Sequence, residues 1–257
     1  MADSLSASFP GAGSSHGVPS DRGQEQDPVA EQFVSVDLTC PACKSRFSTL
    51  QPKTTAIRPR RGKEYDEFLY TEYDGPNPSH YSVLVCPACL YAAYKGDFDD
   101  LAARVAIQAD KQARKEQWGN HTFTGLRDGA TAQASYELAV RCYEHHRRRR
   151  LSMQGALHLE MAWLAYEEGD RDKAQSYMMQ AYSDYSRSYA EEAAASVEGE
   201  LRRTYILGLL AAQLGNPGEA LTWLEATTKQ PDLKKYPEME RRVRGRWSAL
   251  REATKST

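Results

Sequence analysis

Two identical CPAC tetrapeptides are the part of this sequence whose residue types and spacing could do chemistry. Each places two thiols three positions apart, and two such pairs present four thiolates tetrahedrally to a soft or borderline divalent metal. Four thiolates saturate a zinc ion and leave no position for water, so such a site stabilises a fold and does not hydrolyse a substrate. We therefore predict one structural zinc ion per chain, held by Cys40, Cys43, Cys86 and Cys89.

Two other chemistries use closely spaced cysteines. A rubredoxin-like iron site has the same four-thiolate ligand set and would transfer electrons. A thioredoxin-type dithiol needs only one cysteine pair, which normally sits at the start of a helix. Both tetrapeptides here follow β-rich segments instead. This context favours metal binding, with zinc ahead of iron and both ahead of dithiol redox chemistry.

Short strands are expected to deliver the chain to each pair of cysteines. Residues 33–39 alternate and are β-branched, residues 80–85 are similarly β-rich, and residues 47–50 are a candidate return strand. We predict a zinc-ribbon-like module with four cysteine ligands over residues 33–97. A module of this size is marginally stable alone, and zinc binding contributes roughly 10–16 kcal/mol in small zinc peptides. Residues 1–32, rich in Ser, Gly and Pro, are predicted to be a disordered tail.

Composition and charge exclude several classes of protein. The chain has 257 residues, 40% hydrophobic and 26% charged, with a formal net charge of −2. This balance is typical of globular proteins and argues against a general nucleic-acid coat, which needs an excess of Lys and Arg. Because neither an apolar run long enough for a membrane span nor a secretory signal is present, we expect a cytoplasmic protein without a membrane partner. The five cysteines fit a reducing compartment.

From residue 98 the apolar residues recur with helical spacing, which predicts an all-helical domain over residues 98–253. Gly169 and Gly215 are each followed by small or apolar residues at offsets of five, nine and twelve, and each is preceded by a small residue seven positions earlier. Small residues let antiparallel helices approach closely, and a glycine lets the chain reverse. The pattern is similar to tetratricopeptide hairpins, although the glycines lie 46 residues apart and the usual repeat is about 34 residues. The predicted helices span 98–116, 129–149, 152–168, 171–187, 190–214, 217–229 and 237–253.

The predicted fold class is therefore α+β: a small zinc-ribbon-like β module followed by an all-α tetratricopeptide-like helical array. In such arrays the first helix of each hairpin lines a concave groove. Aromatic residues and arginine are favoured at binding hot spots, and four of them are candidate partner-binding residues: Trp163, Tyr166, Arg202 and Tyr205. The alternative for Trp163 and Tyr205 is that they fill the seam between helices.

Two basic segments have a functional and a structural interpretation. Arg58, Arg60 and Arg61 precede an acidic block, so they are either a solvated loop paired with those acids or a phosphate contact. Residues 145–150 read HHRRRR, which fits either cations near a helix C-terminus or a surface for an anionic partner. The fifth cysteine, Cys142, lies within a helical apolar pattern and is predicted to be a buried, unreactive thiol.

The stretches 38–43, 73–78 and 81–93 contain both CPAC tetrapeptides and a Gly-Pro-Asn-Pro turn before the second of them. In these stretches the sequence resembles the bacterial domain-of-unknown-function family 2225, over roughly residues 36–230. The resemblance implies the metal site and the helical repeats and adds no reaction. Family members tend to carry glycine after each second cysteine, where the chain turns with positive φ, whereas this chain has Lys44 and Leu90.

These observations lead to three hypotheses about function. The first is a non-enzymatic, metal-stabilised adaptor or scaffold that binds a protein or peptide through its helical repeats. The second is a nucleic-acid-binding zinc-ribbon protein that uses the two basic segments. The third is a rubredoxin-like iron redox protein. We favour the adaptor, because the residues that bind metal leave no open position and no other motif for catalysis is present.

Overall fold

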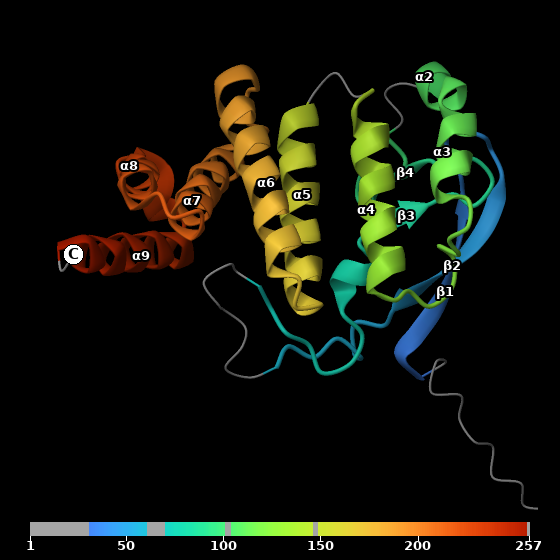
Figure 1. Cartoon of the computed structure of the whole chain (residues 1–257), viewed down its shortest axis with the longest axis horizontal. Coiled ribbons are helices and arrows are strands. Elements are labelled where there is room, and N and C mark those ends of the chain that lie inside the picture. The colour runs from blue at the N-terminus through green and yellow to red at the C-terminus, as the bar shows by residue number, and fades with distance from the viewer. Residues whose placement is uncertain (1–30, 61–69, 101–103, 146–148, 256–257) are drawn as a thin grey trace, which may run out of the picture.

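The computed structural model describes residues 31–60, 70–100, 104–145 and 149–255. The predicted disordered tail, apart from its last two residues, lies outside the described residues. Figure 1 shows the helices following one another across the molecule, from α3 beside the strands through α4, α5 and α6 to α7, α8 and α9 at the opposite end. The α+β class predicted from the sequence is confirmed, since two small β-hairpins precede the series of helices.

Two antiparallel hairpins carry the CPAC tetrapeptides in their turns. Strands β1 (Phe33–Thr39) and β2 (Arg46–Pro52) form the first hairpin, and β3 (Val83–Val85) and β4 (Ala92–Tyr94) form the second. The prediction of a strand over 80–85 is wrong in its first half. Residues Pro78–Tyr81 form a 3-10 helix, η1, because Asn77 accepts a hydrogen bond from the Ser79 N–H and Pro78 favours the first turn.

Among the predicted helices, the one over residues 98–116 differs most from the structure in its position. The chain turns at residues 95–99 instead, and two helices follow, α2 (Arg104–Ala109) and α3 (Lys111–Trp118). Phe98 is buried in the core, and Asp97 is engaged by the Tyr143 hydroxyl, so neither residue begins a helix. Helix α4 (Gly129–Tyr143) starts where predicted, with Asp128 capping the Thr131 N–H, but it ends before the predicted residue 149.

The C-terminal helices form two antiparallel hairpins and a final helix. Helices α5 (Arg150–Glu167) and α6 (Arg171–Glu191) form the first, and α7 (Val197–Gln213) and α8 (Pro217–Thr228) form the second. A short 3-10 helix, η2 (Pro231–Lys235), leads into α9 (Pro237–Lys255), which packs on α8. Ser196 and Asp170 cap α7 and α6 through the N–H groups of Gly199 and Lys173.

Both hairpins reverse through the same glycine turn. Gly169 and Gly215 each have φ +80°, a left-handed conformation that glycine adopts without a steric cost. The residue after each glycine donates its N–H to a carbonyl five positions back, at 2.9 Å from Asp170 and 2.8 Å from Asn216. This is the Schellman ending of a helix. The predicted equivalence of the two glycines is thus a shared backbone geometry.

The aligned positions after the two glycines are all buried, namely Ala174, Met178, Ala181, Ala220, Leu224 and Thr227. The close approach expected at the small residue before Gly215 is also present. A Cβ atom placed on Gly208 would lie 2.8 Å from Cγ of Leu224. The backbone of α7 therefore packs directly against a side chain of α8 at this point. The structure therefore has helical hairpins with this spacing, and the tetratricopeptide likeness itself stays a prediction.

One hydrophobic cluster joins the cysteine hairpins to the helices. It contains Cys40, Cys86 and Cys89 together with Phe98, residues of α4, and Leu157, Met161 and Leu164 of α5. A second cluster lies between α5, α6 and α7, and a third between α7, α8 and α9. The domain boundary that we predict near residue 97 falls within the first cluster, so the metal module and the first helices share a core.

Candidate metal centre

The four predicted ligands come together at the facing turns of the two hairpins. The Sγ atoms of Cys40 and Cys89 are 3.7 Å apart and those of Cys43 and Cys86 are 3.6 Å apart. All four sulfurs lie within 4.8 Å of one another. Around a zinc ion with Zn–S bonds of about 2.3 Å, tetrahedral sulfurs are about 3.8 Å apart. The thiols are therefore spaced to hold one metal ion.

The two turns have the same backbone geometry. In the first, the Cys40 N–H donates to the Ser45 carbonyl at 2.9 Å and the Lys44 N–H donates back to the Cys40 carbonyl at 2.9 Å. The second repeats this with Cys86, Tyr91 and Leu90, at 2.9 and 2.8 Å. Lys44 has φ 66° and Leu90 has φ 55°. The turn with positive φ is thus kept, although both positions carry a side chain that this conformation disfavours.

The thiols are close enough to share protons. Hydrogen bonds from the Cys86 and Cys89 thiols to the Cys40 thiolate lower the pKa of Cys40 to about 2. The same contacts raise the pKa of Cys86 to about 12, and they raise the pKa of Cys89 as well. Four thiolates this close repel one another, so they ionise together only when a cation is bound between them.

Three of the four cysteines are fully buried, and Cys43 is partly exposed. A metal bound here would have protein on most sides and four protein ligands, which is the arrangement of a structural site. The donor set fits both zinc and iron, because tetrahedral sites with four sulfur ligands hold either metal. The chemistry that the bound metal supplies is the cross-linking of two hairpins that share no strand pairing within the described ranges.

A buried arginine supports the second turn. Arg114 of α3 has no exposed surface, and its Nε donates to the Leu90 carbonyl at 3.1 Å. Its Nη2 donates to the carbonyls of Cys89, at 3.0 Å, and of Ile107, at 2.7 Å. The carboxylate of Asp110 lies 3.3 Å from Nη1 of Arg114 and compensates the charge of the guanidinium. The guanidinium thereby fixes the peptide groups on both sides of the turn that carries a metal ligand.

Arg127 plays a similar part on the strand that leads to the second turn. It is buried and donates to the carbonyls of His80, at 3.1 Å, and Val83, at 2.8 Å. Sequence reasoning missed both Arg114 and Arg127, because charged residues are normally exposed. Only the Asp110 four positions before Arg114 could have hinted at a buried ion pair.

The fifth cysteine is a core residue, as predicted. Cys142 is 1% exposed and accepts a hydrogen bond from the Ala92 N–H at 3.4 Å. Its burial raises the pKa of the thiol to about 11, so it stays protonated near neutral pH. Its sulfur is not among the four that cluster.

The four candidate partner-binding residues do not share one surface. Trp163 and Arg202 both line a cavity between α5, α6 and α7. Tyr205 is only 3% exposed and packs with Val243 of α9. Tyr166 lies on another side, with its ring 5.7 Å from that of Tyr70 and the guanidinium of Arg171 3.7 Å from its centre. Arg202 thus shares one cavity with Trp163 and a second cavity with Tyr205, whereas Tyr166 lines neither of them.

The basic segments are only partly described. Arg60 pairs with Glu72 and Asp74, each at 2.9 Å, which agrees with the paired-loop interpretation. Arg61 and residues 146–148 lie outside the described residues. Arg149 has φ 56°, a conformation that cannot continue a helix, and it precedes α5. The predicted extension of the helix from residue 129 to residue 149 is therefore wrong, since α4 ends at Tyr143, and both interpretations of the basic run stay predictions.

Among the helices in the described ranges, none combines the length and apolar character needed to cross a membrane.

Comparison with known proteins finds one family: residues 33–250 match the family described as "Uncharacterized protein conserved in bacteria (DUF2225)". Since the match covers most of the chain, the chain belongs to this family. An "Uncharacterized protein" of Borreliella burgdorferi is 28% identical over 129 residues, which is 44% of this chain and 44% of that protein. No solved structure matches the chain.

Proposed function

We propose that this member of the family is a non-enzymatic adaptor: a zinc-stabilised scaffold that binds a protein or peptide through its helices. The observation that carries the proposal is the shared core. Cys40, Cys86 and Cys89 pack in the same hydrophobic cluster as α4 and α5, so a metal at the cysteines holds the first helices of the array in place. The metal then stabilises the shape of the surface that the helices present.

The chemistry of the centre supports a structural role. Four thiolates saturate a tetrahedral ion and leave no position for a substrate or a water nucleophile. The remaining thiol, Cys142, is buried and protonated. We assign zinc as the metal, one ion per chain, because a closed site of four cysteines on two strand-flanked turns is the usual zinc arrangement. Iron with the same ligands is the alternative. An oxidised iron–tetrathiolate protein absorbs visible light, so a colourless sample containing one equivalent of zinc excludes it.

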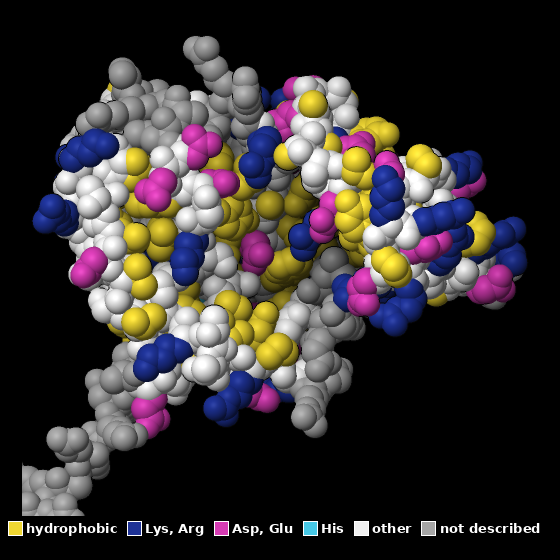
Figure 2. All heavy atoms as spheres, turned by 180° about the vertical axis from the view of Figure 1, so that it is seen from behind, with side chains coloured by type: hydrophobic (Ala, Val, Ile, Leu, Met, Phe, Trp, Pro, Cys, Tyr) yellow, Lys and Arg dark blue, Asp and Glu magenta, His cyan; other side chains and the backbone are white. Residues whose placement is uncertain are grey.

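The helices offer the binding surface. Figure 2 shows a hollow in the molecule between the larger body and the C-terminal helices, with many hydrophobic side chains on its walls. Aromatic and arginine residues, which dominate binding energies at interfaces, line a cavity in the helical part, with Trp163 and Arg202 among them. Nucleic acid is the less favoured partner, because Arg60 in the first basic segment is neutralised by two carboxylates.

The metal claim is tested by substitution of the ligands. The double variant Cys40→Ser and Cys86→Ser should bind less than about one tenth of an equivalent of zinc by elemental analysis, since half of the ligand set is lost. It should also lose cooperative thermal unfolding. Cys142→Ala is the matched control, because it removes a buried thiol that lies outside the cluster, and it should keep one equivalent. Full zinc content in the double variant would refute the site.

The adaptor claim is tested by chemical cross-linking and capture from native cells, with the zinc-loaded chain and the double cysteine variant as bait. We expect a defined partner, recovered in stoichiometric amount with the zinc-loaded chain and absent with the variant. A partner that both baits capture equally would show that the metal does not support binding. Recovery of nucleic acid with a steep salt dependence would instead support the zinc-ribbon alternative.

A further inference from the structure

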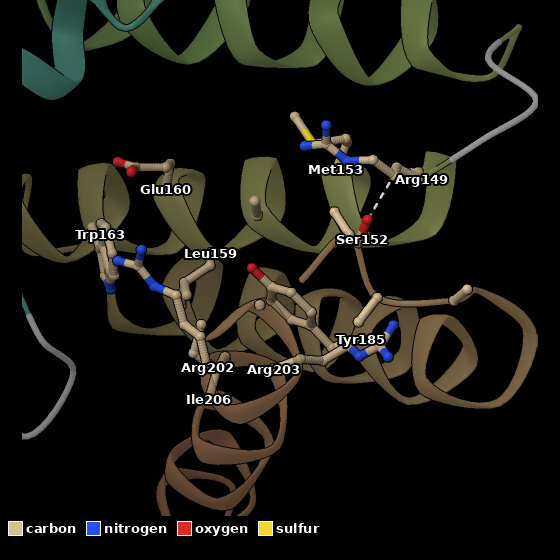
Figure 3. A pocket seen from close by; sticks show the side chains of 15 residues that line it. Arg149, Ser152, Met153, Leu159, Glu160, Trp163, Tyr185, Arg202, Arg203 and Ile206 are labelled. Carbon is tan, nitrogen blue, oxygen red and sulfur yellow. Dashed lines mark hydrogen bonds between the residues drawn. The ribbon is translucent and has the colours of Figure 1, made fainter. Parts of the chain in front are cut away.

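A cavity of about 360 Å³ lies between α5, α6 and α7, apart from the cysteines. Helix α5 forms one wall, Tyr185 of α6 forms the floor, and the start of α7 forms the opposite wall. In Figure 3 the Tyr185 hydroxyl points into this space, and the side chains of Glu160, Trp163 and Arg202 reach toward one end of it. The volume is within the range of small-ligand sites, about 300–1,000 Å³.

The lining of the cavity contains buried polar atoms that have no hydrogen-bond partner. Among the described residues, these include Oε2 of Glu160, Nε1 of Trp163 and Nε of Arg203. More than about nine in ten buried polar groups in proteins are hydrogen-bonded, so three orphans in one lining are unusual. Glu160 and Trp163 are three positions apart on α5, which places an acceptor and a donor on the same face of that helix. The cavity is thus equipped for a ligand with both a donor and an acceptor.

The charges of the lining favour an anion at one part of the ligand. Arg203 is compensated by Glu200 and by the carbonyls of Ser188 and Glu192. Arg202 is exposed and has no hydrogen bond or ion pair in the described structure, and the lining holds a single carboxylate, that of Glu160. Arginine binds carboxylates through two parallel hydrogen bonds. The donors therefore outnumber the acceptors, and the surplus is cationic.

We infer that this cavity binds an α-carboxylate together with the nitrogen on its α-carbon, as found at the C-terminus of a peptide. Arg202 and the Trp163 N–H bind the carboxylate, and Oε2 of Glu160 accepts from the nitrogen. The side chain of the terminal residue lies against the apolar part of the lining, which includes Met153, Leu159 and Ile206. The inference rests on the proposed function, because it identifies the part of a peptide partner that the helices recognise.

The same chemistry is present in a free amino acid, and the experiment separates the two sources. The readout is the indole N–H resonance of Trp163 in the ¹⁵N-labelled, zinc-loaded protein, assigned through Trp163→Phe. Trp118 and Trp223 are internal references, because their N–H groups already donate to Glu137 and to the Tyr182 hydroxyl. The probes are N-acetyl-alanyl dipeptides ending in Leu, Met or Phe, their C-terminal amides, and free leucine.

We expect at least one acid dipeptide to move the Trp163 proton downfield at millimolar concentration while the two reference protons stay in place. A charge-assisted hydrogen bond contributes about 1.5–3 kcal/mol, so the amide and the Arg202→Ala variant should each bind roughly ten- to a hundredfold more weakly. Arg241→Ala, an exposed arginine of α9 outside the cavity lining, should bind like the wild type. Binding of free leucine with equal affinity would assign the site to an amino acid instead of a peptide end.

Two results would overturn the inference: acid and amide forms that bind equally, or no shift of the Trp163 resonance with any acid probe or with leucine. The outcome is separable from that of the adaptor proposal. A partner captured from cells equally well by the wild type and by Arg202→Ala would keep the adaptor and reject the cavity as its binding site. Binding of the acid dipeptides without any captured partner would keep the cavity as a binding site and reject the adaptor.

Discussion

The guanidinium of Arg114 donates to the carbonyl oxygen of Cys89 over 3.0 Å, so a side chain of α3 holds the peptide group of a metal ligand. This contact links the cysteine turns to the helices directly. Like the outer hydrogen bonds around other metal sites, it fixes the orientation of a ligand from outside the ligand set. The geometry of the centre therefore depends on a helix that begins only at Lys111, well beyond Cys89 in the chain.

Arg114→Met should destabilise the zinc-loaded protein by about 3 kcal/mol or more, because three carbonyl groups lose their buried donor. Zinc affinity should also fall, by about ten- to a hundredfold. Urea unfolding and competition with a chelator measure the two effects. Arg141→Met is the control, since Arg141 binds the same Asp110 but is 44% exposed, and it should cost less than about 1 kcal/mol. Equal losses in both variants would refute the role of Arg114.

Lys44→Gly and Leu90→Gly should change the stability of the protein in opposite directions, although each replaces a residue of positive φ with glycine. Glycine relieves about 1 kcal/mol of backbone strain at either position. Lys44 is exposed and loses little else, so its variant should be slightly more stable. Leu90 is 4% exposed, and removing its side chain costs about 2–5 kcal/mol of packing. Thermal unfolding of the two zinc-loaded variants measures the contrast, which would fail if both changes had the same sign.

The contribution of Glu160 to the stability of the protein should fall between pH 4.5 and pH 7. Burial raises the pKa of Glu160 from 4.5 to about 7, and hydrogen bonds with Ser79 and Tyr136, together with the positive charge of Arg202 farther away, only partly offset this. The folded state therefore binds this proton more tightly than the unfolded state, and the free energy of unfolding decreases as pH rises through the window. The loss approaches about 3 kcal/mol above pH 7.

Glu160→Gln removes this dependence, so the difference in unfolding free energy between variant and wild type should grow in favour of the variant from about pH 5 to about pH 8. Urea unfolding at each pH measures it. The cysteine centre is the same in both proteins, and its own pH dependence cancels in the difference. A constant difference across this range would show that Glu160 titrates normally.

Gly208→Ala should destabilise the second helical hairpin. The added methyl group would meet Cγ and Cδ2 of Leu224 at 2.8 and 2.9 Å, and overpacking of this kind costs about 1–3 kcal/mol. Gly218→Ala, on α8, is the matched control because open space surrounds its position, and alanine there should be neutral or stabilising. Circular dichroism during thermal unfolding compares the two, and equal stabilities would argue against the close contact of α7 and α8.

Local signals predicted most of the elements correctly. The cysteine spacing marked the hairpin turns, and the glycines marked the two helix reversals, because each depends on residues close together in the chain. One error arose from a distant contact, and another from a local turn signal, Asn77 followed by Pro78, that outweighed the β-rich pattern after it. The helix expected from residue 98 starts later because Phe98 is drawn into the core, and the start of the strand expected from residue 80 is a 3-10 helix instead.

The sequence by itself determined the four metal ligands, the strands that lead to them and the helical character of the rest, since thiol spacing and hydrophobic periodicity are properties of neighbouring residues. Only the tertiary structure decided that Arg114 is buried against the second turn, that Tyr205 packs inside while Arg202 remains outside, and that Oε2 of Glu160 lies without a hydrogen-bond partner. Burial and pairing of polar groups depend on which helices meet, and that is set by the packing of the whole chain.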